Sequence, residues 1–260
     1  MATKLKKKVI DGIAPVTLAS CVMMGDGTET TVAQLLDSLS AGTTNNKYAG
    51  KSALWLGDSI SVVNGSGDGT SGAGGTYPQL VCNALGMTLT NKASSGGNSE
   101  RMRNILQGGD NYTAVDCSGF DYAFIKIGHN CDYATEGLTD GTSSISGIPT
   151  DSTAPADFPT TFHGNVASCI EYILSQNPKC NIFLITPIWS SAGRYIGTTT
   201  KAAVALKEVG DFYGIPVIDL HGESGISQKN ASTWTYDGTH PNSDGVKRIA
   251  DYIVAYLKCH

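Results

Sequence analysis

Two hydrophobic patterns alternate along residues 48–260. Short uninterrupted apolar runs, typical of strands buried on both faces, are separated by segments whose apolar residues recur at helical spacing. The runs occur at 53–59, 87–93, 121–128, 181–189 and 215–220. The expected helices lie at 77–86, 100–106, 162–178, 201–212 and 243–258. This alternation predicts an α/β fold, a doubly wound three-layer sandwich with a parallel sheet of about five strands.

Residues 1–47 differ in character from the rest of the chain. Short apolar pieces are followed by one short segment that predicts an amphipathic helix, with four apolar residues at helical spacing: Val32, Leu35, Leu36 and Leu39. Because this apolar face is too small to form a core of its own, it must pack on another surface. We therefore expect residues 1–47 to be an attachment or oligomerisation segment and 48–260 to be the α/β domain. The surface on which this segment packs is either the α/β domain or a second copy of the chain, which would give a homo-oligomer.

Composition excludes several classes of protein. The 260 residues carry a formal net charge of −5, so the chain lacks the basic surface that nucleic-acid binding requires. No apolar run approaches the ~18 residues of a membrane span. The seven cysteines are scattered without a C-x-x-C pair, which indicates reduced thiols rather than disulfides or a zinc site. We expect no nucleic-acid partner, no membrane span, no metal and no cofactor.

The amino terminus resembles a lipoprotein signal only in part. The residues Leu18, Ala19, Ser20 and Cys21 have a lipobox-like order after a lysine-rich start. However, Asp11, Gly12 and Pro15 interrupt the apolar stretch that a signal peptide needs. This pattern favours a cytoplasmic or particle-associated protein over a classically secreted one.

Polar residues suited to one reaction stand at the ends of the expected strands. Ser59 ends the first strand, and Asp237 and His240 precede the last helix. The carboxyl ends of parallel strands meet at one edge of a sheet, where the ligand crevice lies. At a spacing of three residues, the Asp237 carboxylate can hold one nitrogen of the His240 imidazole. The other nitrogen can then take the proton of a serine hydroxyl.

Two further strand ends supply hydrogen-bond donors. Gly96 follows the second strand, and its backbone N–H can approach a bound oxyanion without interference from a Cβ atom. Asn130 follows the third strand and offers a side-chain N–H. Together with the backbone N–H of Ser59, these groups give three donors for one oxygen, as an oxyanion hole requires.

These segments resemble the four blocks of the SGNH hydrolases, also called the GDSL esterase/lipase family. The matching residues are Gly57-Asp58-Ser59-Ile60, Gly96, Gly128-x-Asn130 and Asp237-x-x-His240, in the family's order and within residues 52–257. The resemblance implies that Ser59 is the nucleophile, His240 the base and Asp237 its orienting group. It also implies an oxyanion hole formed by Ser59, Gly96 and Asn130.

The sequence departs from the family pattern at three places. Ile60 replaces the usual leucine, and Cys131 stands between Asn130 and Asp132, where the family often has aspartate directly after the asparagine. Gly96 and Gly97 are adjacent, and we choose Gly96 because it lies five residues after Asn91, as in the family.

Alternative interpretations remain for these residues. Ser59 would also suit an ordinary turn, and Asp237 with His240 would also suit the start of the last helix. A conventional α/β-hydrolase elbow, G-x-S-x-G, is excluded because position 61 is serine. A catalytically silent carbohydrate-binding or structural module of the same fold stays open. The remaining histidines lack a comparable partner pattern, which indicates structural or surface roles: His129, His163, His221 and His260.

Loop composition and aromatic residues indicate the substrate class. Residues 64–75 contain no bulky apolar side chain, which disfavours a deep tunnel for a long acyl chain. Four aromatic residues near strand ends are candidates for stacking on sugar rings, although packing is an equally good interpretation: Trp189, Tyr195, Trp234 and Tyr236. We therefore expect a serine esterase acting on a small ester or an acetylated glycan. A lipase or thioesterase of the same family is the alternative.

Overall fold

The computed structural model describes residues 21–23, 29–31, 46–131 and 136–260 of the chain. It divides into two compact units, Met1–Lys47 and Tyr48–His260. In the first unit, β1 (Cys21–Met23) pairs with β2 (Glu29–Thr31) in an antiparallel hairpin. The helix expected around residues 32–39 lies outside the described residues, and the attachment role of this unit stays a prediction.

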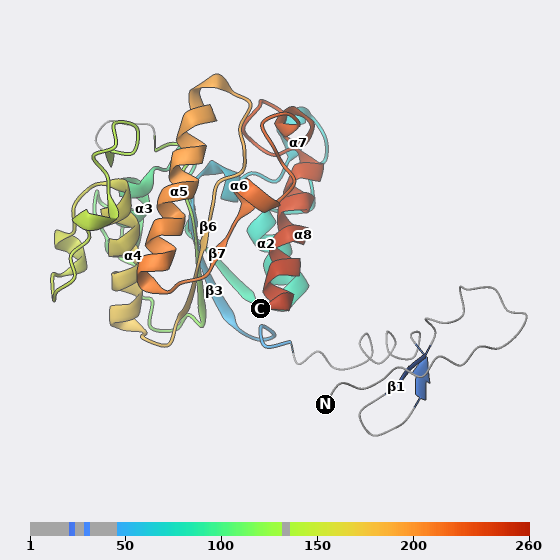
Figure 1. Ribbon diagram of the computed structural model, residues 1–260, viewed down its shortest axis with the longest axis horizontal. Coiled ribbons are helices and arrows are strands. Elements are labelled where there is room, and N and C mark those ends of the chain that lie inside the picture. Colours follow the sequence, from blue (N-terminus) through green and yellow to red (C-terminus); the bar gives the residue numbers. More distant parts are fainter. Residues whose placement is uncertain (1–20, 24–28, 32–45, 132–135) are drawn as a thin grey trace, which may run out of the picture. The chain divides into compact units, whose positions relative to one another are not determined.

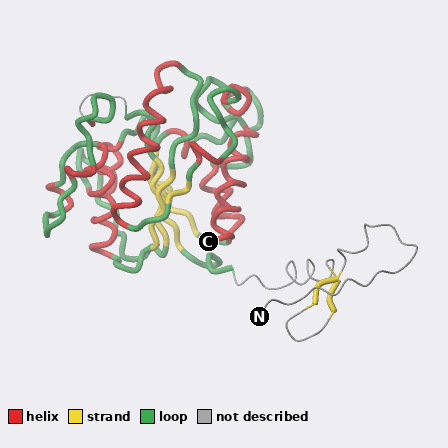
Figure 2. The backbone as a smooth tube through the Cα atoms, in the orientation of Figure 1, coloured by secondary structure: helices red, strands yellow, loops and turns green. Residues whose placement is uncertain are grey.

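The second unit contains a five-stranded parallel sheet with helices on both faces (Figures 1 and 2). Its strands are β3 (Ser52–Gly57), β4 (Thr88–Asn91), β5 (Tyr122–Lys126), β6 (Asn181–Ile185) and β7 (Val217–Ile218). The strand order is β4-β3-β5-β6-β7, and each neighbouring pair is parallel. The α/β prediction is therefore confirmed.

Five long helices occur where the sequence predicts them. They are α2 (Tyr77–Leu85), α3 (Ser99–Gln107), α4 (Phe162–Gln176), α5 (Ile196–Tyr213) and α8 (Ser243–Cys259). Short helical elements that the periodicity does not predict are η2 (Ser59–Ser61), η3 (Ser66–Asp68), η5 (Ile145–Gly147), η6 (Pro155–Asp157), η7 (Gly193–Tyr195), α6 (Leu220–Glu223) and α7 (Ala231–Trp234). Segments this short show no helical period.

Alternate residues of each strand pack into two separate cores. Leu54 and Leu56 of β3 face the layer formed by α3, α4 and α5. Ala53 and Trp55 face the opposite layer, which contains α2 and α8 (Figure 1). In that layer the Trp55 ring stacks on Phe124 of β5, with ring centroids 4.4 Å apart. Burial on both faces explains why the strands have continuous apolar runs.

The strand order places a topological switch point at the carboxyl ends of β3 and β5. The first strand of the sheet, β3, lies between β4 and β5, so the connections on its two sides run in opposite directions. Ligands of doubly wound sheets bind at such a switch point, outside the carboxyl ends of the strands. Among the described residues, no helix is long and apolar enough to cross a membrane.

Candidate active site

The turn after β3 holds Ser59 at the carboxyl end of the strand. Asp58 caps η2 by accepting a hydrogen bond from the backbone N–H of Ile60, at 3.0 Å. Gly57 is required just before this turn, because a Cβ atom there would lie 2.6 Å from Ser61 Oγ and 2.8 Å from the backbone oxygen of Lys126. The chain therefore turns tightly as it leaves the sheet, and Ser59 is the first residue of η2.

His240 lies between Ser59 and Asp237. Its Nε2 atom is 2.9 Å from Ser59 Oγ, and its Nδ1 atom is 2.6 Å from Asp237 Oδ2. The second carboxylate oxygen of Asp237 accepts the backbone N–H groups of Thr239 and His240. Burial raises the pKa of Asp237, but these hydrogen bonds outweigh burial and lower it below the ordinary value. The residue that caps α8 is Asn242, whose side chain accepts from Gly245, so Asp237 and His240 are not the capping residues.

The loops after β4 and β5 meet beside Ser59. Gly96 has a φ of +70°, and a Cβ atom added there would meet nothing within 4 Å. The N–H of Gly97 is already donated to Ser94, which favours Gly96 over Gly97 as the free donor. Asn130 donates its side-chain N–H to the backbone oxygen of Gly97 at 3.2 Å, which joins the two loops.

Two further contacts hold these loops in place. Asn91, at the end of β4, donates its side-chain N–H to the backbone oxygen of Ser61 at 2.9 Å. The buried Glu136 carboxylate accepts the backbone N–H groups of Ser99 and Glu100 at the start of α3. The segments after β3, β4 and β5 are thus fixed to one another by side chains. Within the described part of the chain, no group of three His, Cys, Asp or Glu side chains is placed to hold a metal ion.

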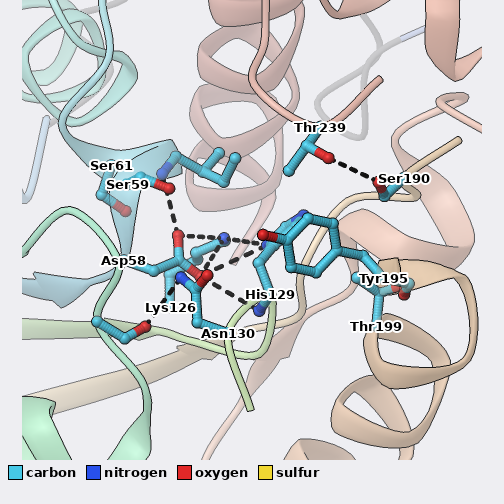
Figure 3. Close-up of polar contacts among 12 residues, drawn as sticks. Asp58, Ser59, Ser61, Lys126, His129, Asn130, Ser190, Tyr195, Thr199 and Thr239 are labelled. Atoms are coloured by element: carbon cyan, nitrogen blue, oxygen red, sulfur yellow. Dashed lines mark hydrogen bonds and ion pairs between the residues drawn. The ribbon is translucent and has the colours of Figure 1, made fainter. Parts of the chain in front are cut away.

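A buried ionic cluster that the sequence interpretation missed lies next to Ser59 (Figure 3). Lys126 Nζ, at the end of β5, contacts both carboxylate oxygens of Asp58, at 2.7 and 2.9 Å. The same ammonium group lies 2.8 Å from His129 Nδ1. The signal for this cluster was present in the sequence: Lys126 interrupts an apolar run of a strand buried on both faces, and a buried lysine needs a partner.

The cluster shifts the pKa values of all three side chains. Burial raises the pKa of Asp58, but the Lys126 charge and the hydrogen bonds outweigh burial and hold it well below the ordinary value. Burial lowers the pKa of Lys126, against the opposing effect of Asp58. Burial and the Lys126 charge lower the pKa of His129 to about 4. His129 is therefore neutral at pH 7.

The four aromatic candidates each have a ring contact within the protein. Tyr236 lies parallel to the His240 imidazole, with centroids 5.8 Å apart. Trp189 stacks on His221 at 4.1 Å, and Tyr195 meets His129 edge to face at 6.3 Å. The guanidinium carbon of Arg248 lies 4.6 Å from the centre of the Trp234 ring. These contacts are packing roles, and sugar stacking by the four residues stays a prediction.

Of the other histidines, His163 is buried and contacts polar side chains other than those around Ser59. Its Nδ1 atom lies 2.8 Å from Ser143 Oγ, and its Nε2 atom lies 2.9 Å from Glu208 of α5. These contacts tie α4 to α5 and to the preceding loop.

Comparison with known families shows the family to which the chain belongs. The model of the GDSL-like lipase/acylhydrolase family matches residues 55–248. The chain belongs to this family. The matched range begins within β3 and includes Ser59, Gly96, Asn130, Asp237 and His240. Membership in the GDSL-like lipase/acylhydrolase family implies hydrolase activity.

Solved structures resemble this GDSL-like chain in fold. A possible lipase from Chitinophaga pinensis matches with a TM-score of 0.62 and 19% identity, over 80% of this chain and 98% of that one. The lipase/acylhydrolase from Enterococcus faecalis matches with a TM-score of 0.55 and 21% identity, over 80% and 96%. A catalytic mutant of an acetylxylan esterase from Geobacillus stearothermophilus matches with a TM-score of 0.54 and 17% identity, over 80% of this chain and 94% of that one. A comparison with curated protein sequences gives no significant match.

Proposed function

We propose that this protein is a serine esterase that hydrolyses small acyl esters, with O-acetyl groups on carbohydrate as the preferred substrate class. The observation that carries the proposal is the continuous contact from Ser59 Oγ through His240 to the Asp237 carboxylate. A serine hydroxyl is a weak nucleophile, and an imidazole held by a carboxylate activates it.

In the first half of the reaction, Ser59 Oγ attacks the ester carbonyl carbon while His240 Nε2 takes the hydroxyl proton. Asp237 keeps the imidazole oriented and stabilises the imidazolium. The negative charge moves to the carbonyl oxygen, which receives the N–H groups of Ser59, Gly96 and Asn130. The bond to the leaving alcohol then breaks, His240 returns the proton to the alcohol oxygen, and the acyl group stays on Ser59.

In the second half, water replaces the alcohol. His240 takes a proton from the water, whose oxygen attacks the acyl carbon. The same donors hold the second oxyanion, and the bond to Ser59 Oγ then breaks. Ser59 regains its proton from His240, and the acid leaves. The Asn130 side-chain nitrogen carries two hydrogens, and only one of them is used in the contact with the backbone oxygen of Gly97. The other can be donated to the substrate oxygen in both halves of the reaction.

The surroundings of Ser59 support a small acyl group on a large, accessible alcohol. The side chains of His240 and Asp237 are 26% and 42% exposed, so a large alcohol group can reach Ser59 from solvent. The loop at residues 64–75 contains no bulky apolar side chain to line an acyl tunnel. One solved structure of similar fold is an acetylxylan esterase by its title. A fold likeness at this identity is weaker support than the exposure of His240 and Asp237.

A substrate panel tests the proposal. Purified full-length protein would be assayed with 4-nitrophenyl acetate, butyrate and laurate, and with acetylated xylan and other acetylated glycans by acetate release. We expect acetate to be the best acyl group and laurate the worst. A preference for laurate would instead support a lipase, and no turnover of any ester would support a silent binding module.

Active-site labelling tests the chemistry separately. A fluorophosphonate should modify Ser59, which peptide mass spectrometry can locate, and His240→Ala should suppress the labelling because the base is missing. Modification at another serine, or equal labelling of the variant, would contradict the assignment.

A further inference from the structure

Three buried side chains next to Ser59 have no role in the proposed reaction. Asp58 and Lys126 are fully buried, and His129 is 1% exposed. Charged side chains are almost never fully buried unless they are paired, because removing charge from water is costly. The burial of these charges therefore has to be explained by the residues that the cluster contacts.

The cluster joins two segments of the site. On one side, Asp58 Oδ1 accepts the N–H of Ile60 and so fixes the turn that begins with Ser59. On the other side, Asp58 Oδ2 lies 3.4 Å from the backbone N of His129, which precedes Asn130. Lys126 links the same two sides through its side chain, because its ammonium contacts both Asp58 and the His129 ring.

The contact with Lys126 also fixes the tautomer of His129. A lysine ammonium group only donates, so Nδ1 of the ring must accept and the proton must sit on Nε2. Among the described residues, Nε2 is buried without a hydrogen-bond partner. The groups that face the ring are Lys126, Asp58, the edge of Tyr195 and, at longer range, His240.

We propose that Asp58, Lys126 and His129 form a positioning network that holds the turn of Ser59 and the loop of Asn130 at a fixed separation. Lys126 is its central positioning residue. The network rests on the proposed function, since the separation matters only if Ser59 and Asn130 act on one substrate. A nucleophile and an oxyanion donor must be placed to within a fraction of an ångström, and a shift of ~1 Å can cost about 100-fold in rate.

The chain offers a matched control for this network. Lys51 and Asp121 also form a lysine–aspartate pair between the segments of β3 and β5, with 2.8 Å between Nζ and Oδ1. This second pair lies at the start of both strands and is exposed, with 45% and 36% of the side chains accessible. Lys51→Met thus removes the same charge, between the same strands, away from Ser59.

The main experiment compares Lys126→Met with Lys51→Met by steady-state kinetics on 4-nitrophenyl acetate. In Lys126→Met we expect kcat to fall about 100-fold while KM stays within about threefold, because placement in the transition state is lost and ground-state binding is not. Lys51→Met should leave kcat within about twofold, as an exposed pair contributes little. Equal kcat values for the two variants would overturn the proposal.

A double variant separates positioning from charge balance. Lys126→Met alone leaves the Asp58 carboxylate buried without its cation, whereas Asp58→Asn/Lys126→Met leaves no charge and keeps an acceptor for Ile60. We expect the double variant to recover thermal stability relative to Lys126→Met but to keep a kcat at least about tenfold below wild type, because His129 still lacks its donor. Recovery of wild-type kcat would show that Lys126 only neutralises Asp58, and would overturn the proposal.

Nuclear magnetic resonance provides a readout that needs neither activity nor a variant. Long-range 1H–15N spectra of the wild type should show His129 neutral, with the proton on Nε2, from pH 8 to pH 5. In Lys126→Met, the pKa of His129 should rise above about 4, because burial and Asp58 remain while the lysine charge is gone. A wild-type proton on Nδ1 would overturn the network. Absence of esterase activity with the expected tautomer would overturn the proposed function alone.

Discussion

The two ends of the same pair of strands carry similar residues in opposite environments. At the amino ends, Lys51 and Asp121 pair in solvent. At the carboxyl ends, Asp58 and Lys126 pair with no exposure, and the strands that supply the acid and the base are exchanged. Two lysine–aspartate pairs thus connect the segments of β3 and β5. Water screens the charges of the first pair and does not reach those of the second.

The difference shows what burial adds to an ion pair. In solvent, two flexible side chains gain little from meeting, since water competes for both and salt screens the attraction. In the interior, water does not compete for either charge, so each is held in one position by the protein groups around it. The exposed pair joins the amino ends of β3 and β5. The buried pair holds the residues that follow the carboxyl ends of these strands in position.

The largest contrast is between Ser52, the first residue of β3, and Ser59, which follows the other end of the strand. Ser59→Ala should lower esterase activity by a factor of at least about 10⁴, because the acyl group has no other acceptor. Ser52→Ala is the same substitution at the other end of the strand, where Ser52 Oγ donates to the backbone oxygen of Gly119. It should leave kcat/KM nearly unchanged. Rates on 4-nitrophenyl acetate measure both, and activity retained by Ser59→Ala would contradict the proposed mechanism.

Asparagine provides the next contrast. Asn130→Ala removes one oxyanion donor and should lower kcat by a factor of about 100 to 1,000, with a smaller change in KM. Asn181 begins β6 at the amino edge, where its side chain contacts the backbone oxygen of Asp121 at 3.3 Å. Asn181→Ala should leave kcat within about twofold, because the group lies at the edge of the sheet away from Ser59. An effect of Asn130→Ala confined to KM would mean that this residue only binds substrate.

How much of this the sequence predicted differs between fold and site. The five strands follow from continuous apolar runs, because a strand buried on both faces permits few polar residues. Ser59, Asp237 and His240 could be proposed because their residue types and their places after strands match one reaction. Their mutual distances could not be predicted, since they depend on how three loops pack at one edge.

The buried cluster illustrates what a pattern cannot supply. Lys126 is visible in the sequence as a charge in an apolar run, and its burial predicts that it has a partner. Nothing in the spacing specifies Asp58 as that partner, because the contact joins residues 68 positions apart. His129 was interpreted as structural or surface, since one histidine without a motif carries no signal of its neighbours. Only the register of β3 against β5 brings the three together.

Two glycines beside β3 give a contrast in stability. A Cβ atom on Gly57 would overlap Ser61 and Lys126, so Gly57→Ala should lower the free energy of unfolding by about 1–3 kcal/mol and also reduce kcat through the displaced turn. Gly50 has a φ of +75° and open space around it. Gly50→Ala should therefore cost only the backbone strain of about 1 kcal/mol, with unchanged kcat. Urea unfolding of both variants measures the loss of stability, and rates on 4-nitrophenyl acetate measure kcat. Equal kcat values for the two variants would contradict the role of the turn.

Acidification should weaken the carboxyl edge before the amino edge. The folded pKa of His129 is about 4, against about 6.5 in the unfolded chain, so the unfolded state takes up a proton first. The stability that neutral His129 contributes is complete above about pH 6.5 and is lost as the pH falls to about 4, by up to about 3 kcal/mol. The lowered pKa of Asp121 acts only below the ordinary aspartate value of about 3.9.

Urea unfolding of wild type and His129→Gln at pH 7.5 and pH 4.5 measures this effect. The wild type should lose more stability between the two pH values than the variant, because the variant has no proton to bind at this position. All other groups are common to both proteins, so their contributions cancel in the difference. Identical losses would show that His129 is not held neutral in the fold.

The smallest expected effect distinguishes the two ion pairs by salt. Lys51→Met should change the thermal midpoint by no more than about 2 °C at low salt, because the pair is exposed. At 1 M salt the Debye length is about 3 Å, so even this difference should disappear. Lys126→Met should lower the midpoint by the same amount at both salt concentrations, because ions do not enter the interior between β3 and β5. A salt-sensitive difference for Lys126→Met would mean that water reaches the Asp58 carboxylate, and the contrast between the two edges would then be one of degree.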